Sequence, residues 1–164
     1  IKPMMNRAYE KGSKVILKHS MLFRNVEYNK WVDDSYLLIG KSFFFKQEYI
    51  VANESFEFVS RNFPKSPSRF DAQLWLAKSH VFAGRYQRAD LVLTSLEPFV
   101  DRGETSKDVK RMFPLVKADY LIRNGQYNLA AEYLEKALAV KELFIMYSTG
   151  FPSPVFQIAN FVHI

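Results

Sequence analysis

The sequence contains no cysteine. Disulfide bonds, thiolate metal sites and a cysteine nucleophile are therefore excluded for these 164 residues. No stretch approaches the roughly 18 consecutive apolar residues that a membrane span needs. The chain begins at Ile1, with neither an initiator methionine nor the apolar core of a signal peptide. We interpret this beginning as a cut inside a longer protein.

Catalytic sequence motifs are also missing, since HExxH, GxSxG and GxGxxG do not occur. Residues 39–42, Ile-Gly-Lys-Ser, look like the end of a phosphate-binding P-loop. That motif needs a glycine five positions before Gly40, where Ser35 stands. We expect Gly40 to lie inside a helix at a packing position. The sequence thus predicts a protein that is not an enzyme and has no cofactor.

Metal chemistry is not indicated either. His19, His80 and His163 lack the spacing of metal ligands, and His80 falls on a buried position of an expected helix. A core histidine with a hydrogen-bond partner is the favoured interpretation for His80. Asp33 and Asp34 stand at an expected helix start, where N-capping and a favourable interaction with the helix dipole explain them.

Aromatic residues and positive charge are what the chain has in quantity. It holds 15 Phe and 9 Tyr, and its net charge is +6. This charge is compatible with an acidic partner, an anionic membrane surface or nucleic acid. The basic residues are interspersed with acids, however, as in 65–71 and 101–111. A solvated surface of mixed charge is therefore expected.

A short pattern recurs three times. It reads QEYIVA from Gln47, GRYQRA from Gly84 and GQYNLA from Gly125, with Tyr and Ala always three apart. Its tyrosines, Tyr49, Tyr86 and Tyr127, are separated by 37 and then 41 residues. Such spacing predicts repeats of a helix pair joined by a tight turn.

Helical periodicity flanks each copy of the pattern. The expected helices span about 33–46, 49–62, 67–83, 86–99, 109–124 and 127–146, after an N-terminal helix at about 4–18 and a loop over 19–31. Residues 1–138 form the predicted helical-repeat domain, with repeats at about 33–64, 70–99 and 109–138. Residues 139–164 contain the end of the last helix and an apolar tail, which we interpret as a cap or a truncated repeat.

The same packing roles recur in each predicted repeat. The tyrosine is expected to fill the gap at the turn, and the alanine to allow two helices to approach closely. Ser66 is the expected N-cap before Pro67. The predicted facing residues are Ile39, Phe43, Ala52, Phe56 and Val59; Leu76, His80, Ala89, Leu93 and Leu96; and Ala118, Leu121, Ala130, Leu134 and Ala137.

These markers resemble the tetratricopeptide (TPR) repeat over about 31–138. The first repeat matches the TPR pattern at Ile39, Gly40, Phe43, Tyr49, Ala52, Phe56 and Pro64. The later repeats keep the Gly, Tyr and Ala of the turn but carry Ala77 and Ala118 at the small glycine position, and the third, which begins near Pro114, is the weakest match. The resemblance implies an all-α, right-handed α-solenoid of antiparallel helix pairs.

Two narrower resemblances point to the bacterial envelope. Residues 28–49 resemble TPR lipoproteins of Bacteroidetes linked to gliding motility and type IX secretion. Residues 52–67, with the later Gly-Arg-Tyr turn, resemble the TPR lipoprotein of the outer-membrane assembly machine. Both imply a scaffold at the periplasmic face of an outer membrane, held by a lipid anchor that this cysteine-free chain does not carry; otherwise a cytoplasmic location is expected.

In TPR arrays the first helix of each repeat lines a concave groove, so the resemblance also implies partner-binding positions. These are Leu37, Lys41, Phe44, Phe45, Leu74, Lys78, Phe82, Leu115, Asp119, Ile122 and Arg123. Leu37 and Lys41 stand where chaperone-binding TPRs have Lys and Asn, which disfavours that ligand. The alternative is that Phe44 and Phe45 pack against a neighbouring helix or a missing part of the chain.

We therefore expect a protein-interaction scaffold that binds a peptide or partner helix. The rival expectation is a nucleic-acid-binding or regulatory helical repeat that uses the positive charge. Nucleic acid is the less favoured partner, because the basic residues do not align in one stripe.

Overall fold

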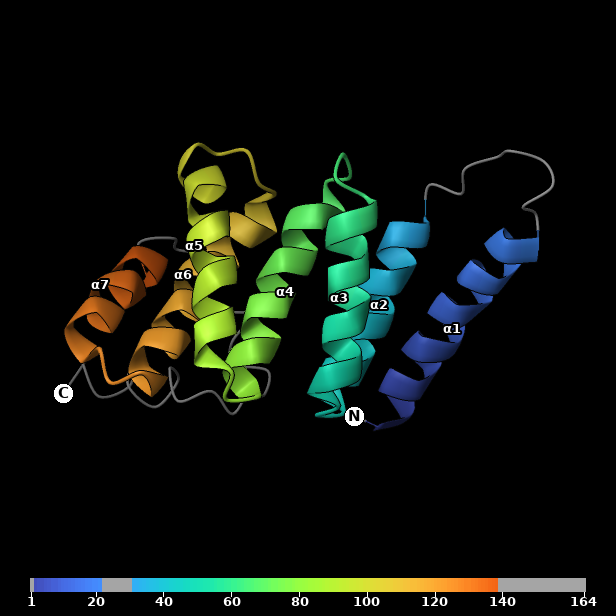
Figure 1. Ribbon diagram of the computed structural model, residues 1–164, viewed down its shortest axis with the longest axis horizontal. Helices are drawn as coiled ribbons and strands as arrows, with labels where there is room; N and C mark the ends of the chain where they lie inside the picture. The colour runs from blue at the N-terminus through green and yellow to red at the C-terminus, as the bar shows by residue number, and fades with distance from the viewer. Residues whose placement is uncertain (1, 22–30, 139–164) are drawn as a thin grey trace.

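The computed structural model describes residues 2–21 and 31–138, and within these ranges the chain is entirely helical (Figure 1). The helices are α1 (Lys2–Met21), α2 (Val32–Phe45), α3 (Tyr49–Asn62), α4 (Ser68–Phe82), α5 (Tyr86–Asp101), α6 (Lys107–Arg123) and α7 (Tyr127–Leu138). None of the described helices is long and apolar enough to cross a membrane.

Packing is mostly between neighbours in the sequence. Each described helix contacts the next one along the chain. In addition, α2 contacts α4, and α4 contacts α6. Figure 1 shows the helices following one another from α1 (blue) to α7 (orange). The first helices of the predicted pairs, α2, α4 and α6, therefore lie side by side.

The predicted helices are confirmed, with small changes at their ends. The helix α1 extends to Met21, beyond the predicted end near residue 18. The helix α4 starts at Ser68, so the predicted N-cap role of Ser66 is wrong: Pro67 occupies the N-cap, and it has no side chain that could accept a capping hydrogen bond. Pro114 lies inside α6, which begins seven residues earlier at Lys107. Several predicted features lie outside the described residues. They are the continuation of α7 over 139–146, the apolar tail, His163 and the 22–30 part of the predicted loop.

Left-handed turns join the helices of each pair. Gln47, Gly84 and Gly125 have φ values of 67°, 71° and 76°. After each, a backbone N–H reaches five residues back, from Glu48 to the Phe43 carbonyl and likewise in the other two turns. This satisfies carbonyls at the helix end and needs φ above zero. Gly84 and Gly125 adopt it without strain, as the turn pattern predicted.

The predicted facing residues form the core. Ala52, Phe56 and Val59 in the first repeat, and their equivalents in the second and third, are buried, while Phe43 is partly buried against them. Gly40 lies in α2, as expected, directly against the ring of the fully buried Phe56. His80 is buried as predicted, and its Nδ1 accepts a hydrogen bond from Asn53 Nδ2 at 3.3 Å.

The predicted role of the turn tyrosine holds in only two copies. Tyr49 packs against Phe44 and Phe82, with ring centroids 5.6 and 6.2 Å apart, and Tyr86 is partly buried against the core. Tyr127 is 65% exposed, so the prediction is wrong there. Tyr49 is covered by the helix that follows its own repeat, whereas no described helix follows α7.

The predicted N-cap role of Asp33 and Asp34 is also corrected. Trp31 occupies the N-cap of α2, and both aspartates lie in the first turn, where they still favour the helix dipole. Their carboxylates accept hydrogen bonds from hydroxyls near the start of α4: Asp33 from Ser66, and Asp34 from Ser68 at 2.6 Å. The two aspartates thus join successive repeats.

Candidate functional site

A cluster of cations and aromatic rings joins α2, α4 and α6. We call it the cation–aromatic cluster; its members are Lys41, Phe44, Phe45, Trp75, Lys78, Phe82 and Arg123. Six of these seven were predicted from the sequence as groove positions. Trp75 was missed, although it directly follows the predicted Leu74.

The aromatic half of the cluster is centred on Phe44. Its buried ring meets Trp75 and Phe82 edge to face, with centroids 5.4 and 5.3 Å apart. Phe45 lies beside it and also contacts Trp75, at 5.8 Å, but remains half-buried. The alternative expectation is therefore met for Phe44, which packs on the neighbouring helices, while Phe45, Trp75 and Phe82 keep part of their surface exposed.

The cationic half lies over these rings. Lys41 Nζ and Lys78 Nζ are 5.1 and 4.9 Å from the centre of the Trp75 ring, and the Arg123 guanidinium is 5.0 Å from that of Phe82. The negative face of an aromatic ring attracts cations, more strongly where water is excluded. The rings thereby hold three positive charges from three helices.

Burial changes the titration of the two lysines. Desolvation lowers the pKa of Lys78 to about 8, which the nearby Asp119 opposes and the positive Lys41 reinforces. Desolvation also lowers the pKa of Lys41, against the attraction of Asp71, Asp108 and Asp34. Both ammonium groups therefore carry an energetic cost that a nearby anion would reduce.

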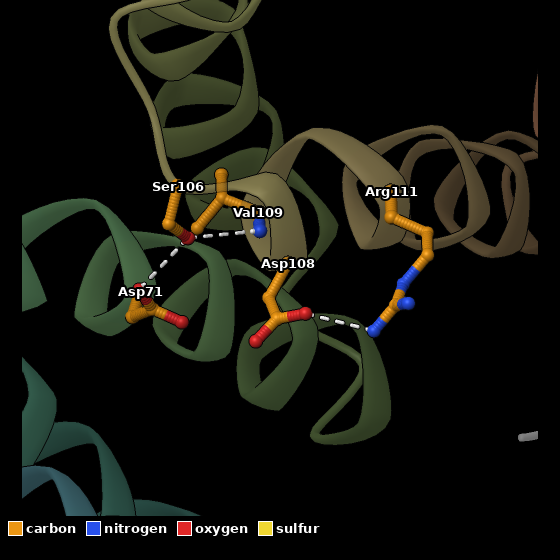
Figure 2. A network of polar contacts seen from close by, with 5 residues as sticks. All are labelled: Asp71, Ser106, Asp108, Val109 and Arg111. Atoms are coloured by element: carbon orange, nitrogen blue, oxygen red, sulfur yellow. Dashed lines mark hydrogen bonds and ion pairs between the residues drawn. The ribbon is translucent and has the colours of Figure 1, made fainter.

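The neighbouring carboxylates have partners of their own. Asp119 accepts a hydrogen bond from Arg123 Nε at 3.2 Å, and burial raises its pKa. Asp71 accepts one from Ser106 at 3.3 Å, while Asp108 pairs with Arg111 at 2.7 Å (Figure 2). These acids lie around the lysines, so this part of the surface has mixed charge.

The other predicted groove residues contribute mainly to the core. Leu37 and Leu74 are buried in two separate hydrophobic clusters. Leu115 and Ile122 are half-buried and pack against the buried cluster of Ala118 and Leu134. The cation–aromatic cluster, and not the whole predicted set, is therefore the candidate site.

Two other features of the described residues do not form a site. An open cavity of about 600 Å³ is lined by Gly84, Arg85, Tyr86, Gln87 and Arg88 at the α4–α5 turn. These are consecutive residues, and no second helix contributes a group. Over residues 2–21 and 31–138, no three His, Cys, Asp or Glu side chains are grouped in a way that could hold a metal ion.

Comparisons of the chain with protein-family models, with curated proteins and with solved structures find no match. Function is therefore inferred from the helices and side chains described above.

Proposed function

We propose that this chain is a TPR-type array, a right-handed α-solenoid of antiparallel helix pairs, that acts as a non-catalytic scaffold for protein–protein interaction. Three features support the array: recurring left-handed turns, the contacts of α2 with α4 and of α4 with α6, and the alanines buried after each turn. The sequence resemblance adds the proposal of an envelope assembly at the periplasmic face of an outer membrane.

The binding surface in this proposal is the cation–aromatic cluster, which is the observation that carries the function. Partly exposed aromatic rings and cations from three helices lie together there, and aromatic residues and arginine are enriched in protein interfaces. A peptide or partner helix would cover Phe45, Trp75 and Phe82 and meet the charges of Lys41 and Arg123.

Selection from a displayed library of random peptides tests this function. We expect selected peptides to bind the unaltered protein and to lose at least tenfold in affinity for Phe45→Glu, because the new charge would be desolvated beneath the peptide. The Lys78→Glu variant should weaken binding as well. Circular dichroism establishes that each variant is folded.

The matched control is Leu91→Glu, since Leu91 is 71% exposed on α5 and outside the cluster. It should bind the selected peptides normally. A library that yields no binder, or binders that are insensitive to both cluster variants, would refute the proposed function.

Nucleic-acid binding is the rival function, and the cluster disfavours it because its lysines are partly buried and surrounded by Asp71, Asp108 and Asp119. The rival predicts affinity for DNA or RNA at low salt that falls steeply as salt is added. Absence of binding at about 50 mM salt eliminates it.

A further inference from the structure

The ammonium groups of two lysines from different helices lie near the Trp75 ring. Lys41 comes from α2 and Lys78 from α4, and their Nζ atoms lie 5.1 and 4.9 Å from the centre of the same indole ring. Lys78 Nζ is also 5.6 Å from the centre of the Phe44 ring. Two like charges thus share one small, partly apolar site.

Repulsion and desolvation make this arrangement costly. Lys78 is only 9% exposed, and Lys41 adds a second positive charge beside it. A buried charge is costly unless an opposite charge or hydrogen-bond acceptors compensate it. The indole offers only a quadrupole, which attracts each cation less strongly than a full negative charge would.

The nearby carboxylates compensate these lysines only in part. Asp119 attracts Lys78 electrostatically, and Arg123 also engages Asp119 through a charged hydrogen bond. Among the described residues, Lys41 forms no ion pair, although Asp34, Asp71 and Asp108 attract it from a distance. Because burial disfavours the charge of both lysines, an additional anion beside them would reduce that cost.

We propose that Lys41 and Lys78 together bind one side-chain carboxylate, from Asp or Glu, of a partner segment that packs against Trp75. This inference rests on the proposed function and specifies the partner's chemistry. A single carboxylate fits because the surrounding acids would repel a dianion such as phosphate. The flanking Phe45 and Phe82 rings suit apolar residues beside that acid.

The test uses two pools of short peptides, acetylated at the N-terminus and amidated at the C-terminus so that no terminal carboxylate is present. One pool has Glu at its central position and the other has Gln, with all remaining positions randomised identically. Each pool is passed over the immobilised full chain, and the retained peptide is measured. We expect the Glu pool to be retained at least fivefold more than the Gln pool.

Two variants locate the effect. Lys41→Met and Lys78→Met keep an unbranched side chain of similar length and remove the charge, so each should abolish the preference for Glu. Lys65→Met is the control, because Lys65 is exposed in the α3–α4 turn and should leave the preference intact. In a Trp31→Phe background, Trp75 is the sole tryptophan, and its emission should change saturably with the Glu pool alone.

The outcomes separate the two proposals. Equal retention of the Glu and Gln pools, or a preference that survives both cluster lysine variants, overturns the carboxylate site while leaving a peptide-binding scaffold in place. Retention of neither pool, together with a library selection that yields no binder, overturns the proposed function itself.

Discussion

At the residue scale, Gly40 allows α2 to approach the Phe56 ring of α3 closely, because it has no side chain. A Cβ placed on Gly40 would lie 2.5 Å from Cε1 and 2.7 Å from Cδ1 of Phe56. Phe56 is fully buried and cannot move aside without displacing its neighbours. The glycine that resembled part of a P-loop is therefore a packing residue.

Gly40→Ala should accordingly destabilise the protein by about 1–3 kcal/mol, because overpacking outweighs the gain of about 1 kcal/mol in helix propensity. The free energy of unfolding, measured in denaturant, checks this. Adding Phe56→Leu to Gly40→Ala should make the alanine less costly than it is with Phe56 present. An alanine that stabilises the protein on its own would contradict the packing.

Lys78 gives a second residue-scale prediction, in its response to pH. The folded protein releases the Lys78 proton near pH 8, whereas the unfolded chain holds it up to about pH 10.5. Between these values the unfolded state binds more protons, so this group makes stability rise with pH, by about 3 kcal/mol at most. Below pH 8 its contribution is a constant penalty.

Lys78→Met should remove that rise and stabilise the protein at pH 7. Denaturant midpoints of the variant and the unaltered chain, measured from pH 7 to pH 10.5, provide the comparison. Other groups titrate in the same window and affect both proteins alike, so the difference between the two curves reports Lys78. Parallel curves would mean that its ammonium is well solvated.

At the scale of the helical element, the starts of α4 and α6 are each bonded to the helix two places earlier in the chain, α2 and α4 respectively. Ser106 is the N-cap of α6, accepting from Val109 N at 3.2 Å, and its hydroxyl also donates to Asp71 on α4 (Figure 2). Ser66 makes the corresponding contact from the start of α4 to Asp33 on α2. Each hydroxyl thus orients the start of a helix on its neighbour, and that of Ser106 also caps its own helix.

Ser106→Ala should therefore cost about 1–2 kcal/mol of stability, since it removes a cap and leaves the partly buried Asp71 without its donor. Thermal or denaturant unfolding measures the loss. Ser95→Ala is the control: the Ser95 hydroxyl bonds only within α5, to the Val92 carbonyl, so the change should stay within about 0.5 kcal/mol. Equal effects of the two variants would argue against the tie between helices.

At the scale of the whole molecule, stability should vary along the row of helices. The central α4 has substantial contacts with α2, α3, α5 and α6, whereas among the described helices α1 has them with α2 alone and α7 with α6 alone. Local opening costs more free energy where a helix loses contacts with more neighbours. Amide hydrogen exchange should thus be slowest in α4 and faster in α1 and α7. Uniform protection across the described helices would instead indicate one fully cooperative unit.

Helices, turns and most core positions could be predicted from the sequence, because they depend on local rules. A period of 3.6 residues marks the buried face, and the left-handed turns need Gly or a tolerant polar residue such as Gln47. The Tyr and Ala spacing located the helix pairs for the same reason. The polar residues near helix starts, such as Ser66 and Ser106, could be seen in the sequence, but their hydrogen-bond partners Asp33 and Asp71 could not.

Only the tertiary structure decided which predicted groove residues take part in the candidate site. Leu37 and Phe44 are buried because α2 packs on α3 and α4, and Leu74 is buried because α4 packs on α5 and α6. The distances between these helices are not encoded in residue spacing. The packing of α2 on α4 also brings the Lys41 and Lys78 ammonium groups close to the Trp75 ring and partly excludes water from them. The sequence by itself determined the positions of the helices and of the turns between them. The packing of those helices in space decided which cationic side chains lie against which aromatic rings, because residues distant in the sequence meet only there.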